Sequence, residues 1–206
     1  MKRWIMCLAV AAGLVGAFAL GRADAGEGAD KKAIADEMAA WMELGKTGPE
    51  HAKLIETVGT WTVESKMWME PGAEPVASSG KAVFTALLGG RFVRQEFSGA
   101  FMGQPFLGIG CTGYNNATKQ YEDVWIDSVG TGMMRATGTE TEAGKVWTYF
   151  GSCIGPGGKE YKHRTILKKL GANQMIVEAF CDKGEGETKC WEGSYTRTNE
   201  ASKLGG

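Results

Sequence analysis

His163 is the residue in this chain whose type and position most favour catalytic or cofactor chemistry. In the run Tyr161–Thr165, strand-like alternation places His163 on one face, while the opposite face carries two charged residues, Lys162 and Arg164. Charged side chains favour the outer surface, so His163 is predicted to point inward. An inward histidine has the chemistry of a general base or of an axial haem ligand, and ordinary packing in a strand is the alternative.

Aromatic and acidic residues on other predicted strands favour ligand binding. Trp125 and Asp127 share a strand face, so this carboxylate lies beside a large aromatic surface. Trp61 offers a second aromatic surface, and core packing is an equal alternative for both tryptophans. The predicted ligand contacts are therefore Trp61, Trp125, Asp127 and His163. In an enzymatic alternative, Asp127 or Glu178 assists His163.

The remaining motifs predict neither metal ligands nor catalytic residues. The other histidine, His51, precedes the strands and is expected to pack over one end of the strand region or to face solvent. Two histidines without clustered partners do not match a zinc site. The phosphate loop, the nucleophile elbow, the HExxH motif and the dinucleotide fingerprint do not occur. No cofactor is therefore expected, except in the haem alternative.

The cysteines predict one disulfide and leave a second one open. Cys181 and Cys190 flank a turn, and a symmetric hairpin centred at Glu185–Gly186 sets them opposite each other. We therefore predict a Cys181–Cys190 disulfide. Cys111 and Cys153 fall on predicted strands that are not neighbours, so a bridge across the strand region and two free thiols are both open.

The first 25 residues read as a secretory signal peptide. Lys2 and Arg3 precede the apolar run Trp4–Leu20, and Ala23–Ala25 supplies a small-x-small cleavage pattern. Export to the periplasm or the medium is therefore expected, with an uncleaved anchor as the alternative. No second apolar run of spanning length follows, so the mature protein is expected to be soluble without stable membrane insertion. The net charge of −1 gives no nucleic-acid footprint.

After the leader, the chain divides into a helical segment at residues 26–56, a strand region at 57–199 and a flexible tail at 200–206. In the first, Ile34, Met38 and Trp41 recur at helical spacing after Asp30, a candidate cap, and Pro49 is suited to open a second helix. In the strand region, runs rich in Val, Thr and aromatic residues alternate with Gly-rich breaks. The predicted strands are Thr60–Met69, Lys81–Leu88, Phe92–Ser98, Phe106–Tyr114, Tyr121–Asp127, Met133–Thr139, Val146–Ile154, Tyr161–Leu170, Met175–Asp182 and Lys189–Thr198.

This pattern predicts a mainly β fold, an antiparallel up-and-down β-barrel of about ten strands with a short N-terminal helical segment. Closing the sheet removes long open edges, which ten successive strands would otherwise leave. A barrel of this size has room for one small ligand. The leading hypothesis is therefore an exported barrel that binds a small, largely apolar ligand in its lumen. An enzyme or haem protein that uses His163, and a structural module without a ligand, are the alternatives.

Several clusters resemble the bacterial proteins that carry domain of unknown function 1579. The clusters that carry the resemblance are Glu50–His51 with Val58–Trp61, Leu88–Phe92, Met102–Phe106, Gly113–Asn116, Trp125–Ser128 and Tyr195–Arg197. The resemblance covers roughly residues 50–198 and implies a lipocalin-like or calycin-like barrel of unknown activity, without a set of catalytic residues to carry over. Asn115 departs from the family's aspartate, and the four cysteines of the mature chain look like an addition.

Overall fold

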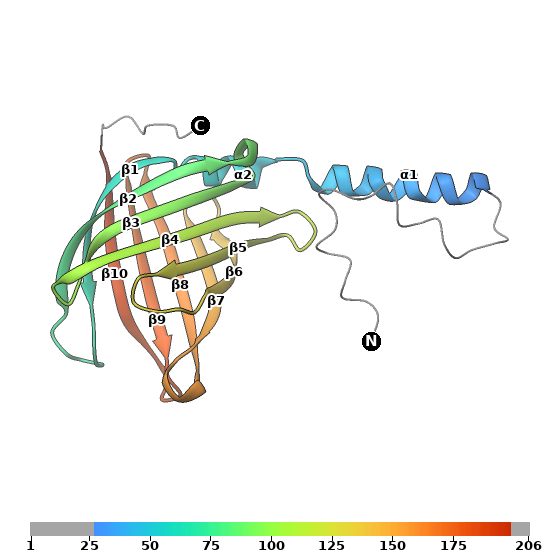
Figure 1. The fold of residues 1–206 in the computed structure, drawn as a ribbon. Helices are drawn as coiled ribbons and strands as arrows, with labels where there is room; N and C mark the ends of the chain where they lie inside the picture. Colours follow the sequence, from blue (N-terminus) through green and yellow to red (C-terminus); the bar gives the residue numbers. More distant parts are fainter. Residues whose placement is uncertain (1–26, 199–206) are drawn as a thin grey trace. The chain divides into compact units, whose positions relative to one another are not determined.

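The computed structural model describes residues 27–198 as a helix followed by a β-barrel (Figure 1). Helix α1 spans Glu27–Leu44 and is described here by itself, because residues up to Glu43 form a unit separate from the rest. It begins three residues before the predicted cap, Asp30. Its apolar side chains, among them Met38 and Trp41, are exposed. The predicted leader at residues 1–25 and the tail at 200–206 lie outside the described residues.

Ten antiparallel strands form a closed barrel, as predicted. Each strand pairs with the next one along the chain, and β10 closes the sheet by pairing with β1 (Figure 1). The strands are β1 Gly59–Met67, β2 Val76–Leu87, β3 Phe92–Phe101, β4 Gln104–Asn115, β5 Gln120–Asp127, β6 Met134–Glu142, β7 Val146–Ile154, β8 Glu160–Gly171, β9 Gln174–Asp182 and β10 Glu187–Arg197. Single turns of 3-10 helix stand at Leu88–Gly90 and Pro156–Gly158.

Alternation along the strands separates an inner face from an outer face. In β1, Trp61 and Val63 are buried, whereas Thr62 and Glu64 are exposed. Residues directly opposite each other in an antiparallel pair lie on the same face, so the register carries the inner face from strand to strand. Following the pairs around the barrel places His163 on the inner face, opposite Gly151 and Cys181. The predicted inward direction of His163 is therefore confirmed.

The short helix α2, Pro49–Ile55, caps one end of the barrel. Pro49 suits its first turn, where an N–H group has no partner within the helix. Leu54 and His51 are buried, and Leu54 belongs to the core together with Trp61 and Tyr121. His51 accepts a hydrogen bond at Nδ1 from the Gly48 N–H, at 3.1 Å. This histidine therefore binds the backbone at the start of α2 and is buried, in agreement with the packing expected for it.

In the described part of the chain, neither α1 nor α2 combines the length and the apolar character that a membrane crossing requires.

Candidate functional site

Aromatic rings lie flat against inward-facing glycines on the barrel wall. A Cβ atom built on Gly108 would lie 2.2 Å from the Trp125 ring, so the indole covers the backbone of β4. Trp191 covers Gly193 in the same way, at 2.2 Å from the nearest ring atom, and Tyr149 covers Gly138, at 2.5 Å. Glycine is needed at these positions because a side chain would occupy the same space as the ring. The three rings therefore pack against the strand backbone of the barrel wall instead of projecting toward the barrel axis.

Asp127 holds the Trp125 ring in this position. The indole Nε1 donates a hydrogen bond to Asp127 Oδ2, at 3.0 Å. Gly108 pairs with Asp127 and Gly110 with Trp125, so the glycines and the indole meet across one strand pair. Asp127 Oδ1 also accepts the N–H of Val129, at 2.9 Å. The predicted pairing of Trp125 with Asp127 on one face is therefore observed, and the carboxylate acts on the ring and the adjacent loop.

Solvent reaches the inner face in the half of the barrel away from α2. Inward side chains there, including Trp125, Trp191 and Phe97, keep part of their surface exposed. Near α2, by contrast, the inward side chains Trp61 and Tyr121 are each 2 % exposed. Inward side chains are therefore more deeply buried at the capped end than at the opposite one.

Asp123 adds a carboxyl group to the inner face beside these rings. Its Oδ1 accepts a hydrogen bond from the Thr112 hydroxyl, at 2.6 Å, and Oδ2 has no donor among the described residues. Burial raises the pKa of Asp123 above its usual range, against the lowering effect of that hydrogen bond. Tyr149 lies near it, and burial also raises the pKa of this phenol, with the charge of Asp123 as the next cause. Asp123 is not among the four predicted ligand contacts, although it lies two residues before Trp125 on the same face.

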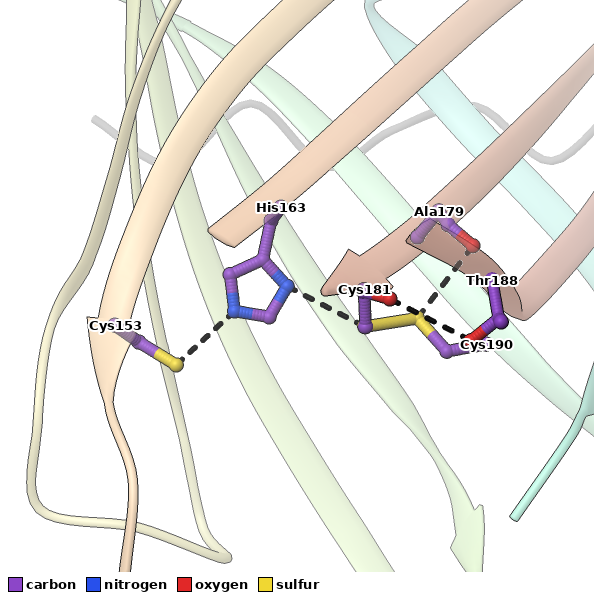
Figure 2. Close-up of a disulfide and its surroundings, with 6 residues drawn as sticks. All are labelled: Cys153, His163, Ala179, Cys181, Thr188 and Cys190. Carbon is purple, nitrogen blue, oxygen red and sulfur yellow. Dashed lines mark hydrogen bonds between the residues drawn. A yellow bond between two sulfur atoms is a disulfide. The ribbon is translucent and has the colours of Figure 1, made fainter. Parts of the chain in front are cut away.

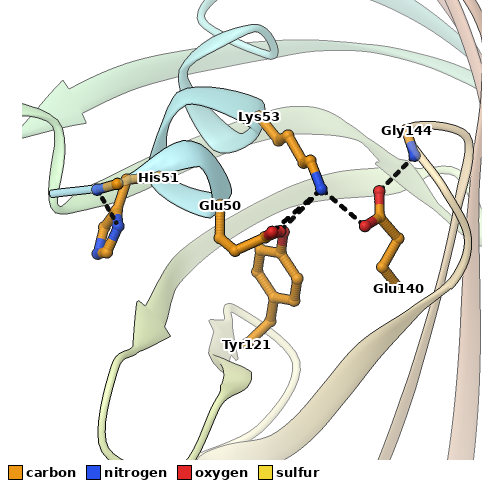
Figure 3. A network of polar contacts seen from close by, with 7 residues as sticks. Glu50, His51, Lys53, Tyr121, Glu140 and Gly144 are labelled. Carbon is orange, nitrogen blue, oxygen red and sulfur yellow. Dashed lines mark hydrogen bonds and ion pairs between the residues drawn. The ribbon is translucent and has the colours of Figure 1, made fainter.

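A polar network joins α2 to the barrel wall (Figure 3). Lys53 binds Glu50, at 3.0 Å, and Glu140 of β6, at 2.7 Å. The Tyr121 hydroxyl donates to Glu50, at 2.5 Å. The Glu140 carboxylate also accepts from the Gly144 N–H. Charged groups here satisfy one another, so the network secures the cap and leaves no free charge for a ligand.

A cavity of about 310 Å³ lies at the same end of the barrel. Trp61 and Met175 form its apolar lining, and Lys169 and Arg197 its cationic lining. Arg197 stacks on Trp61, at 4.1 Å, and donates hydrogen bonds to the carbonyl groups of residues 56, 58 and 172. Lys169 is paired with Glu56. Trp61, predicted as a ligand contact, thus lines this cavity and packs in the core.

His163 lies between a free thiol and a disulfide (Figure 2). Its Nε2 is 3.0 Å from Cys153 Sγ, and its Nδ1 is 3.4 Å from Cys181 Sγ. Both ring nitrogens face sulfur, so the geometry does not favour the haem alternative, which needs one of them free. Burial lowers the pKa of His163, so the ring is neutral at pH 7. The two carboxylates predicted to assist lie elsewhere, since Asp127 binds Trp125 and Glu178 pairs with lysines on the outer face.

Cys181 and Cys190 form the predicted disulfide, but not from directly opposed positions. The hairpin closes at Asp182 and Glu187, and Cys181 pairs with Thr188. The predicted centre at Glu185–Gly186 was therefore wrong, because Asp182 accepts two backbone N–H bonds that tighten the turn. The register shifts between Lys189 and Trp191, so Cys190 is the extra residue of a bulge. This bulge brings the two cysteines together, with Cα atoms 5.9 Å apart.

Within residues 27–198, the other two cysteines, Cys111 and Cys153, are free thiols. Cys111 lies on the outer face of β4, since Arg94 and Val124 are its pairing partners. Cys153 lies on the inner face of β7, opposite Tyr161. The alternative left open by the sequence is therefore settled in favour of two thiols. In residues 27–198, no group of three or more His, Cys, Asp or Glu side chains is arranged to hold a metal ion.

Fold and site together define a closed, ten-stranded antiparallel barrel with an accessible aromatic inner wall. A family model described as a protein of unknown function, DUF1579, matches residues 46–197. The chain belongs to this family, as the sequence clusters predicted. A comparison with curated proteins found no significant match.

Two solved structures share the barrel. The crystal structure of Rv2717c from M. tuberculosis is 15% identical, with a TM-score of 0.55, and the match covers 75% of this chain and 100% of that chain. The S-type phycobiliprotein lyase CPES from Guillardia theta is 10% identical, with a TM-score of 0.50, and the match covers 78% of this chain and 98% of that one. At such identities the likeness shows the fold alone. The likeness to lipocalins stays a prediction.

Proposed function

We propose that this protein binds a small, planar and largely apolar ligand in the half of its lumen away from α2. The observation that carries the proposal is the set of aromatic rings laid flat on inward-facing glycines, with Trp125 on Gly108 as the best example. Rings that only filled a core would be buried, but Trp125 and Trp191 keep exposed surface on the inner face. Flat apolar walls with a few polar groups are typical of ligand sites.

Asp123 indicates which polar group the proposed ligand carries. Its Oδ2 has no donor among the described residues, so a ligand N–H or ammonium group has an acceptor there. Lys169 and Arg197 line the cavity at the capped end, and both are engaged by protein groups. We therefore expect the accessible half to prefer a cationic planar ligand over an anionic one of similar size. Asp127 contributes by positioning Trp125, and Trp61 by supporting the wall from the core.

Replacing Thr165 by Trp tests the lumen. Thr165 faces inward between Tyr149 and Ala179, whereas its neighbour Ile166 pairs with Glu178 on the outer face. Binding of thioflavin T, a cationic planar dye, is measured by fluorescence titration. We expect Thr165→Trp to weaken binding about tenfold or more by filling the lumen, and Ile166→Trp to leave it within about twofold. Unaltered binding by a Thr165→Trp variant with native circular dichroism contradicts the proposal, as does a parent protein that binds no dye.

The role of Asp123 is tested with the same titration. Asp123→Asn is expected to weaken thioflavin T while leaving anilinonaphthalene sulfonate, an anionic dye, unweakened. Glu122→Gln is the matched control, because Glu122 is the adjacent residue and hydrogen-bonds Asn115 outside the lumen. Equal effects of Asp123→Asn on both dyes contradict the charge preference and leave lumen binding standing.

Export through the leader at residues 1–25 is also part of the proposal. The Cys181–Cys190 disulfide supports it, because such bonds persist in oxidising compartments. N-terminal sequencing of the protein recovered from outside the cytoplasm is expected to begin at Gly26. A chain that retains Met1 contradicts cleavage.

A further inference from the structure

We propose that Cys153 is a nucleophile inside the barrel, with His163 as its base, and that it captures ligands that carry an electron-poor carbon–carbon double bond. This inference goes beyond reversible binding, since it assigns a covalent bond to a named sulfur atom. It requires only that small molecules enter the lumen.

The position of the thiol makes it accessible to such a ligand. Cys153 lies on the inner face of β7, and both it and His163 are half-buried, so each keeps surface exposed in the accessible half of the barrel. The residue opposite His163 on β7 is Gly151, which has no side chain to cover the ring. Cys153 Sγ lies 3.0 Å from His163 Nε2 (Figure 2). This is the contact that a thiol needs to pass its proton to a base.

The disulfide fixes which ring nitrogen is the base. A neutral imidazole has one N–H donor and one nitrogen that accepts. The Cys181 sulfur in the disulfide carries no hydrogen, so Nδ1, 3.4 Å away, is the donor of that contact. The lone pair of Nε2 therefore faces Cys153. Burial keeps the ring neutral, because it lowers the pKa of His163, and burial raises the pKa of the Cys153 thiol. The resting pair is thus thiol and imidazole, and the proton moves when the ligand arrives.

The step balances without an oxidant or a reductant. The Cys153 proton moves to Nε2 as the sulfur bonds to the β-carbon of the ligand. The π electrons of the double bond shift to the α-carbon, which then takes the proton back from Nε2. A thioether forms, the double bond is consumed, and His163 returns to its neutral form.

Cys111 provides a control within the same chain. It is also half-buried, and burial followed by the negative charge of Asp123 raises the pKa of its thiol. No histidine contacts it among the described residues. The two thiols therefore differ in the feature that the proposal invokes.

The experiment measures the rate at which N-ethylmaleimide alkylates each thiol at pH 7, resolved by peptide mass spectrometry, with the disulfide intact. We expect Cys153 to react at least tenfold faster than Cys111, within the range that a positioned base supplies. His163→Ala should slow Cys153 about tenfold or more, leave Cys111 within twofold, and be rescued by added imidazole. Cys111→Ser should leave the Cys153 rate unchanged.

Two results overturn the proposal. One is a parent protein in which Cys153 reacts no faster than Cys111, a measurement that needs no variant to fold. The other is a folded His163→Ala protein whose Cys153 rate is unchanged or is not restored by imidazole. Neither result affects the dye titrations, so this inference fails separately from reversible binding.

Discussion

The two halves of the barrel interior use the same residue types in opposite ways. Near α2, Trp61 is 2 % exposed, its indole N–H donates to the Thr57 carbonyl at 2.9 Å, and Phe84 packs against its ring. In the other half, Trp125 lies on glycine backbone and its open side meets solvent. The Trp61 indole therefore fills the core, whereas the Trp125 indole lines the accessible part of the lumen. The difference shows that an aromatic residue on the inner face is not by itself a sign of either core or site.

The two indoles also differ in the partner residue across one strand pair. Trp61 pairs with Ala82, which is completely buried, and lies beneath α2. Trp125 pairs with Gly110 and covers Gly108. At Trp125 the missing glycine side chains let the ring approach the backbone of β4 closely. The buried side chains are thus concentrated at the capped end, and the partly exposed rings at the opposite end.

Replacing one tryptophan in each half by alanine is the strongest test of the difference between the two halves. Trp61→Ala removes a buried ring from the core and is expected to cost about 3–5 kcal/mol of unfolding free energy. Trp125→Ala removes a partly exposed ring and is expected to cost about 1 kcal/mol, the usual size for a point substitution. Urea denaturation followed by circular dichroism measures both. Equal losses, or a larger loss for Trp125→Ala, contradict the division of the interior.

Removing the disulfide tests how much this bond stabilises the accessible half, and the expected loss of stability is intermediate. The Cys181–Cys190 bond closes a loop with a sequence separation of 9, which predicts a loss of about 2.5 kcal/mol on removal from chain entropy. The Cys181→Ser, Cys190→Ser double variant is compared with the parent by urea denaturation. Cys111→Ser, which removes a thiol from the outer face, should change stability little. A double variant as stable as the parent shows that the bulge and turn hold this end without the bond.

Lowering the pH is expected to change the stability least, and this change arises at the capped end. Burial alone would raise the pKa of Glu140, but the hydrogen bonds from Lys53 and Gly144 outweigh it and hold that pKa below its ordinary value of 4.5. A carboxylate with a lowered pKa in the folded state stabilises the fold above its ordinary pKa and loses this contribution as pH falls. The charged or titratable groups around this pair are Glu50, Tyr121 and Lys169. Stability should therefore decline modestly as pH falls below about 4.5.

Glu140→Gln is expected to remove part of this acid dependence. The measurement is the urea midpoint at pH 7 and at pH 3.5 for the parent and the variant. Glu142→Gln serves as the control, because Glu142 lies on the same strand and makes an exposed pair with Lys145. If the urea midpoint of both variants falls between pH 7 and pH 3.5 by as much as that of the parent, the network does not secure the cap through charge.

Much of the fold was readable from the sequence because its signals are local. The run Val146–Ile154 was predicted with the bounds that β7 has, and the Gly-rich breaks marked the turns. Two charges beside His163 were enough to give its direction, since a strand alternates strictly. The disulfide followed from a hairpin with cysteines on both sides, although the assumed register was one that a β-bulge overrides.

The candidate site was harder to predict because it depends on contacts between strands distant in sequence. Asp123 was missed, since its relation to Thr112 is set by the β4–β5 register. The approach of Cys153 to His163 likewise depends on the pairing of β7 with β8, which no local pattern encodes. The sequence did contain one indication of the site, because Gly108 and Gly110 lie on the same face of one predicted strand. That pattern indicates a ring against the backbone only when Trp125 is known to lie across from the two glycines.

Asp127 also connects the shape of the binding wall to a loop outside the lumen. One carboxylate oxygen holds the indole of Trp125, and the other accepts N–H groups of Val129 and Gly130. A change in the backbone after β5 therefore turns the carboxylate, and the carboxylate turns the ring. Substitutions in that loop would retune the interior without altering any residue that faces it, and the emission of Trp125 would register the change from inside the barrel.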